Sequence, residues 1–144
     1  MKTPPFLKLA ALSALMLAGI SVAAPAQAAT GNWNGFANGP TLYQTMWQYD
    51  SQWMSPPDSV PASALMTGAS WVVNCNSYPT GIAEYLHIPS YGYYQLPSIS
   101  GYVGASGIPA KQSMRFSFYI WSNPPRVIAP VVCGGHQLSV YYQY

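Results

Sequence analysis

Proline and glycine divide this chain into short apolar runs, and that division excludes most folds at the outset. The 144 residues include 14 prolines and 12 glycines, and no internal repeat, coiled-coil heptad or low-complexity tract is present. Both residue types interrupt regular structure, so they mark turns and the ends of elements. Short apolar runs between such turns predict a mainly β protein, built as an antiparallel β-sandwich or a small barrel.

Residues 113–121 form the clearest predicted strand. Apolar side chains recur there at every second position, which is typical of a strand with one face in the core. The predicted core residues are Met114, Phe116, Phe118 and Ile120. Residues 126–133 and 137–144 are predicted as the next two strands, and the three runs are expected to form a meander. Further strands are predicted at residues 70–75, 82–88, 91–96 and 98–103.

One short helix is predicted near the N-terminal end of the domain. Its apolar side chains fall at spacings of four, three and four, which places them on one helical face. These residues are Leu42, Met46, Tyr49 and Trp53. Pro40 fits the first helical turn, and Pro56-Pro57 would stop the helix. The alternation of Tyr43, Thr45, Trp47 and Tyr49 leaves a strand open as the alternative.

The first 28 residues are predicted to be an export signal. Lys2 and Lys8 supply positive charge, residues 9–22 are apolar, and Ala26-Gln27-Ala28 has the small-x-small pattern of a cleavage site. The apolar stretch is shorter than the roughly 20 residues of a membrane span. We therefore expect residues 29–144 to form a single exported domain in the periplasm, at the cell surface or outside the cell.

Charge is sparse and balanced in this predicted domain. The whole chain carries a formal net charge of +2, and removal of Lys2 and Lys8 leaves three basic and three acidic residues. These are Lys111, Arg115, Arg126, Asp50, Asp58 and Glu84. Nucleic-acid and anionic-membrane binding need a basic surface, so neither is expected. Such a domain suits neutral partners, namely glycans or other protein subunits.

The two cysteines, Cys75 and Cys133, are predicted to form a disulfide, because an oxidising compartment favours pairing. The alternative is two free thiols, with Cys133 reactive beside His136. Glu84, His87 and His136 are chemically suited to zinc and form a minority metal-site hypothesis. On a strand, however, the odd spacing of Glu84 and His87 would direct them to opposite faces. No cofactor is expected.

Aromatic residues give the better functional hypothesis. Flat rings stack on sugar faces while amide and hydroxyl groups bind sugar hydroxyls, and both kinds of group are mixed in two short segments. The predicted ligand-binding residues are Trp33, Tyr91, Tyr93, Tyr94 and Gln95. The alternative role for these rings is packing within strands, which tyrosine favours.

The last seven residues carry a resemblance to known families. Leu138, Val140, Tyr142 and Tyr144 alternate up to an aromatic terminus. This pattern resembles the closing strand of chaperone–usher fimbrial subunits and is similar to the terminal strand of outer-membrane β-barrels. The resemblance implies assembly through strand edges, with an oligomer formed through the C-terminal strand. Cys133 lies late for a fimbrial subunit, and the many prolines leave little room for membrane strands, so membrane insertion is not expected.

Together these observations predict a non-enzymatic binding module, lectin-like or adhesin-like, that uses exposed aromatic residues. A fimbria-like assembly subunit is the first alternative. A small exported enzyme, inhibitor or toxin component is the second, and no motif in the sequence identifies its chemistry.

Overall fold

The computed structural model describes residues 28–144, so the predicted export signal lies outside the described residues except for its last position. Every regular element in this part of the chain is a β-strand. The strands are β1 (Thr30–Ala37), β2 (Thr41–Gln44), β3 (Gln48–Asp50), β4 (Leu65–Val72), β5 (Ile82–Ile88), β6 (Gly92–Gln95), β7 (Ser100–Gly104), β8 (Arg115–Ile120), β9 (Val127–Val132) and β10 (His136–Gln143).

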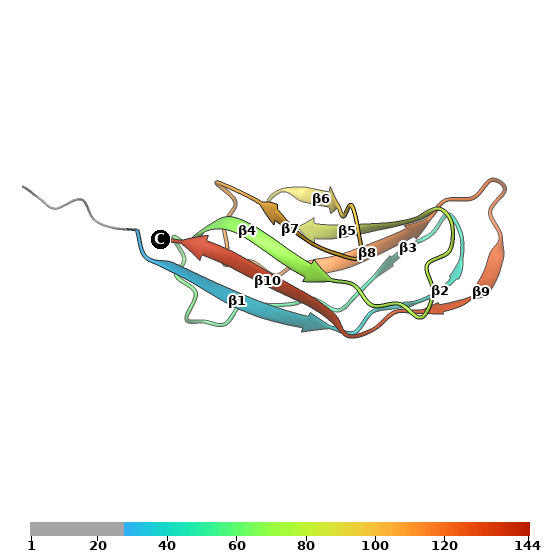
Figure 1. The fold of residues 1–144 in the computed structure, drawn as a ribbon, viewed down its shortest axis with the longest axis horizontal. Helices are drawn as coiled ribbons and strands as arrows, with labels where there is room; N and C mark the ends of the chain where they lie inside the picture. Colours follow the sequence, from blue (N-terminus) through green and yellow to red (C-terminus); the bar gives the residue numbers. More distant parts are fainter. Residues whose placement is uncertain (1–27) are drawn as a thin grey trace, which may run out of the picture.

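The strands form two stacked sheets with a small third sheet at one end. The four-stranded sheets have the orders β1-β10-β4-β7 and β3-β8-β5-β6, and β2 pairs with β9 at the end away from the C-terminus (Figure 1). All pairs are antiparallel. The predicted mainly β fold is confirmed, and its architecture is the sandwich. Residues 28–144 contain no helix that is long and apolar enough to cross a membrane.

The first and last strands run along each other as one folded ribbon. β1 pairs with β10, β2 with β9 and β3 with β8, so the ribbon starts in one sheet and ends in the other. The bend between β2 and β3 lies at Met46, whose φ of 62° is rare for a residue with a side chain. Its N–H donates to the Ile120 carbonyl at 2.8 Å, which fixes the bend against the end of β8.

The core lies between the two sheets and contains the side chains predicted for residues 113–121. Met114, Phe116, Phe118 and Ile120 are all buried, and the inward residues of β10 meet them from the opposite sheet. Trp33 and Trp71 add two large rings, and the indole N–H of each donates to a backbone carbonyl, at 3.0 Å and 2.9 Å. The large rings are thus buried without an unpaired donor.

The predicted helix is wrong. Leu42 lies in β2 and Tyr49 in β3, and the chain bends between the two strands. Leu42 and Tyr49 are buried, whereas Met46 and Trp53 are exposed, so the four residues do not share one face. The bend changes the phase of the alternation, which is why the apolar spacing imitates a helix. Pairing with β9 and β8 then satisfies the backbone groups that a helix would have used.

The predicted meander is also wrong, although its three strands are present. β8 pairs with β3 and β5, β9 with β2, and β10 with β1 and β4. The strands that follow one another along the chain therefore lie in three different sheets. Their partners come from the first half of the domain, and such long-range pairing leaves no local signal in the sequence.

The predicted disulfide between Cys75 and Cys133 is confirmed. Cys133 follows β9, at the corner where the ribbon passes between the sheets, and Cys75 follows β4. The two residues also form an isolated antiparallel bridge. The disulfide therefore ties the ribbon corner to the segment after β4.

We predict that the double substitution Cys75→Ala and Cys133→Ala lowers the free energy of unfolding by about 4 kcal/mol. The bond closes a loop of 58 residues, and its loss restores conformational entropy to the unfolded chain. Guanidinium unfolding of the variant and the oxidised parent measures the difference. A decrease in unfolding free energy below about 1 kcal/mol would contradict the prediction, because it would show that closure of this loop stabilises the fold only slightly.

Candidate functional site

The outer face of the β3-β8-β5-β6 sheet carries a compact group of polar and aromatic side chains. Alternation along these strands sends Phe116 and Phe118 into the core and leaves their neighbours on the outside. We call the group the polar–aromatic cluster, and its members are Gln48, Asp50, Trp53, His87, Tyr93 and Arg115.

Asp50, at the end of β3, organises the polar half of the cluster. Its Oδ2 pairs with Nη2 of Arg115 at 3.0 Å, and its Oδ1 accepts hydrogen bonds from Ser117 Oγ at 2.6 Å and Gln48 Nε2 at 3.0 Å. The Arg115 and Asp50 side chains are only 22% and 28% exposed. This is the one ion pair in residues 28–144, so a substantial share of the sparse charge is concentrated here.

Stacked rings form the other half. The Tyr93 and His87 rings lie parallel with centroids 4.4 Å apart and an interplanar angle of 8°. His87 also contacts Trp53 at 5.4 Å, and the Arg115 guanidinium lies 4.6 Å from the centre of the Trp53 ring. The guanidinium therefore combines an ion pair with a cation–π contact.

These contacts close into a circuit across four strands. Gln48 Nε2 donates to Tyr93 Oη at 3.2 Å as well as to Asp50, and so joins the polar half to the rings. Each side chain is thereby held by at least two others. A site with side chains fixed in this way needs little ordering when a ligand arrives, which favours binding.

A groove of about 280 Å³ lies beside the cluster. Its walls are formed mainly by rings, and it shares two side chains with the cluster. The lining residues are Gln48, Tyr85, Tyr93, Ser117, Phe118, Tyr119 and Trp121. Tyr119 and Trp121 have ring centroids 4.5 Å apart, and Trp121 is 59% exposed. Mostly apolar walls with a few fixed polar groups are typical of small-ligand sites.

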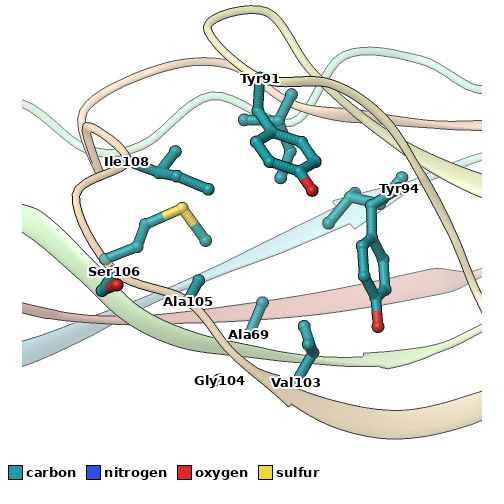
Figure 2. A pocket seen from close by; sticks show the side chains of 11 residues that line it. Ala69, Tyr91, Tyr94, Val103, Gly104, Ala105, Ser106 and Ile108 are labelled. Atoms are coloured by element: carbon teal, nitrogen blue, oxygen red, sulfur yellow. The ribbon is translucent and has the colours of Figure 1, made fainter.

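The predicted segment at residues 91–95 divides between two places. Tyr93 and Gln95 are exposed on β6, whereas Tyr91 and Tyr94 line a separate cavity of about 280 Å³. Figure 2 shows these two tyrosines on one side of the cavity, facing Ala69 and Val103. The other lining side chains are apolar apart from Ser106, so this cavity lacks the polar groups of the groove.

Trp33 is not part of an exposed surface, in contrast to the ligand-binding role predicted for it. Its side chain is 2% exposed in the core, and its indole N–H donates to the Ala110 carbonyl. The flanking asparagines caused the error, because on β1 they point outward while the tryptophan points inward. Asn34 accepts a hydrogen bond from Ser139 on the outer surface.

Glu84, His87 and His136, the predicted metal ligands, are not brought together. Glu84 and His87 lie on opposite faces of β5, and His136 begins β10 in the other sheet. Residues 28–144 contain no group of three or more metal-ligating side chains. Cys133 is in the disulfide, so it is no thiol nucleophile for His136 either.

His136 is instead a core residue at the ribbon corner. Its ring is fully buried against Phe116 and Phe118, and its Nδ1 accepts a hydrogen bond from the Asn74 N–H at 3.1 Å. Burial lowers its pKa from 6.5 to about 4. Protonation would also place a proton on the nitrogen that accepts from Asn74, so the neutral imidazole is the form that fits the fold.

The closing strand has no free edge. β10 lies between β1 and β4 and pairs with both along most of its length. Leu138, Val140 and Tyr142 point into the core as their alternation predicted. An oligomer formed through this strand would therefore require the displacement of β1 or β4.

Sequence reasoning missed Gln48, Asp50, Trp53 and Arg115 as members of the site. The alternation of residues 113–121 already placed Arg115 and Ser117 opposite the core residues. The cluster could have been found by combining the outward-facing residues of 113–121 with those of residues 82–88. The pairing of β3 with β8 supplies the rest, and it was not predicted.

These features define the class of the protein as an all-β sandwich with one disulfide and a polar–aromatic outer face. The chain is similar to the crystal structure of FLHE, with a TM-score of 0.70 and 26% sequence identity. The match covers 80% of this chain and 98% of the FLHE chain. No protein-family model matches the sequence, and no curated protein matches it either.

We predict that Asp50 and Arg115 are coupled by about 1 kcal/mol in a double-mutant cycle. Exposed ion pairs typically contribute 0.2–1 kcal/mol, and the partial burial of this pair places it at the upper end. Chemical unfolding of Asp50→Ala, Arg115→Ala and the double variant gives the coupling. Lys111 and Asp58 are the matched control, because Lys111 contacts the Asp58 carbonyl rather than its carboxylate. Equal coupling in both pairs would contradict the proposed organisation.

We predict that His136 makes the protein less stable as the pH falls from about 6.5 to about 4. The unfolded chain binds a proton in this range that the folded protein excludes, so stability is complete above pH 6.5 and declines below it. The full shift corresponds to roughly 3 kcal/mol. The measurement is the difference in unfolding free energy between the parent and His136→Gln, across this pH range. A difference that does not change with pH would refute the assignment.

Proposed function

We propose that this protein is a non-enzymatic, exported binding module that holds a neutral glycan in the groove beside the polar–aromatic cluster. The observation that carries the proposal is the combination of four rings with fixed hydrogen-bonding groups in one groove. The rings belong to Tyr85, Tyr93, Tyr119 and Trp121, and the polar groups to Gln48 and Ser117.

The rings supply the apolar faces that stack on sugars. Tyr93 is 49% exposed and Trp121 is 59% exposed, so each presents ring surface to solvent. Tyr93 and Tyr85 meet edge to face at 6.4 Å, which orients the two rings differently along the groove. Tyrosine and tryptophan combine a large contact area with a polar tip, and they suit ligands that are both apolar and hydroxylated.

The polar groups are prearranged by the ion pair. Gln48 and Ser117 both donate to Asp50, so their positions are set before a ligand binds. The side-chain oxygen of Gln48 remains an acceptor that suits the hydroxyl donors of a sugar, whereas Ser117 is only 1% exposed and holds Asp50 in place. Because Asp50 is neutralised by Arg115, the groove supports a neutral rather than a charged ligand.

The volume limits the size of the bound portion. About 280 Å³ lies at the small end of ligand pockets, which are roughly 300–1,000 Å³. The groove therefore suits one or two sugar rings of a longer glycan. The confirmed disulfide supports the exported location, since such bonds persist in oxidising compartments.

We predict that Tyr93→Ala and Trp121→Ala each weaken binding to a neutral glycan about tenfold, which corresponds to about 1.4 kcal/mol. A neutral-glycan array identifies the ligand, and calorimetry with that ligand measures the change. The control is Tyr102→Ala, because Tyr102 is 62% exposed on the opposite sheet.

Two outcomes would overturn the proposal. One is the absence of binding to any neutral glycan, and the other is equal weakening by Tyr102→Ala and Tyr93→Ala. All three rings are exposed, so their removal should not unfold the protein. Circular dichroism of each variant checks that a loss of glycan binding is not caused by unfolding.

A further inference from the structure

Glu84 is a carboxylate on the core-facing side of a strand. It alternates with Leu86 and Ile88 on β5, and its side chain is only 7% exposed. Its Oε1 has no hydrogen-bond partner among residues 28–144. Burial raises its pKa, because the charged form has lost its water.

Glu84 is one of the residues that line a pocket of about 510 Å³. β6 ends at Gln95, and the Leu96 N–H still donates to the Glu84 carbonyl at 2.8 Å, so the sheet has a notch just beyond Glu84, beside Ile82 and Ala83. The notch is lined mainly by apolar side chains and by the side-chain amide of Gln95. The lining residues are Tyr78, Ile82, Ala83, Glu84, Gln95, Leu96, Pro97, Ser98 and Ile99.

No side chain of the described residues neutralises Glu84. Arg115 pairs with Asp50, and Lys111 donates to the Asp58 carbonyl. A buried charge without a partner is unfavourable, so a carboxylate in such a position either pairs with a cation or takes up a proton. The pocket that Glu84 lines is open to solvent, so a cation from outside can approach this side chain.

We propose that this pocket binds a primary alkylammonium group on an apolar stem, with Glu84 as its counter-ion. The ammonium supplies the positive charge and the hydrogen-bond donors that the Glu84 carboxylate lacks, and the stem packs on Ile82, Leu96 and Ile99 at the pocket wall. Lysine side chains and free alkylamines both have this chemistry. The site is separate from the glycan groove, so it does not rest on the proposed function.

The test is a titration of the purified protein with n-pentylammonium, followed by amide chemical shifts in the NMR spectrum. We expect shifts to concentrate at residues 82–84 and 95–99, with pentan-1-ol binding at least tenfold more weakly. Glu84→Gln should weaken pentylammonium binding at least tenfold, because it keeps the shape and removes the charge. Glu84→Asp should keep measurable binding.

Asp58→Asn is the matched control, since it removes a carboxylate outside the pocket and should leave binding unchanged. Titration with N-acetyl-lysine amide distinguishes a lysine side chain from a free alkylamine as the natural ligand. Tighter binding than that of pentylammonium identifies a lysine side chain, and weaker binding identifies a free amine. No shifts at large molar excess, equal binding by Glu84→Gln, or equal binding of pentan-1-ol would each overturn the proposal. The same spectra report whether each variant is folded.

Discussion

The antiparallel pairing of the first strands with the last ones is the constraint on which the rest of this structure depends. β1 pairs with β10, β2 with β9 and β3 with β8, so the two ends of the chain run antiparallel to each other from one sheet to the other. Such long-range pairing requires large loops to close, and the entropic cost of this closure is not offset by local contacts. The ribbon corner supplies part of the stabilisation, since the disulfide at Cys133 and the buried ring of His136 lie within four residues of each other.

The polar–aromatic cluster is a consequence of that ribbon. Pairing of β3 with β8 sets Asp50 opposite Ser117 and so within reach of Arg115. Pairing of β5 with both β8 and β6 then sets His87 opposite Arg115 on one side and opposite Tyr93 on the other. Much of the cluster thus consists of cross-strand neighbours, which are contacts that stabilise sheets, and Trp53 joins it from the segment after β3. In a domain with so few charges, the placement of its one described ion pair at this point marks the face as different from the rest of the surface.

Much of the fold could be predicted from the sequence, and much of the site could not. Residues 82–88 and 113–121 were found because alternation and turn residues are local signals. The bend at Met46 defeated the same reasoning, since a change of phase within a few residues imitates helical spacing. Trp33 was misplaced because its polar neighbours were taken as its surroundings, whereas alternation on β1 separates them onto the other face. The cluster escaped prediction because it depends on which strands pair, and pairing joins residues far apart in the chain.

The same alternation explains why one strand contributes to two unrelated chemical environments. On β5, Tyr85 and His87 point outward to the groove and the cluster, while Glu84 points to the core side. The outward face is neutral because its carboxylate is paired within the protein. The inward carboxylate is not paired, and nothing in the sheet requires an acid there, since Leu86 and Ile88 show that apolar residues suit the face. An acid placed on this face against the cost of its desolvation is best explained by a cationic partner that arrives from outside, and this reasoning is independent of what the aromatic groove binds.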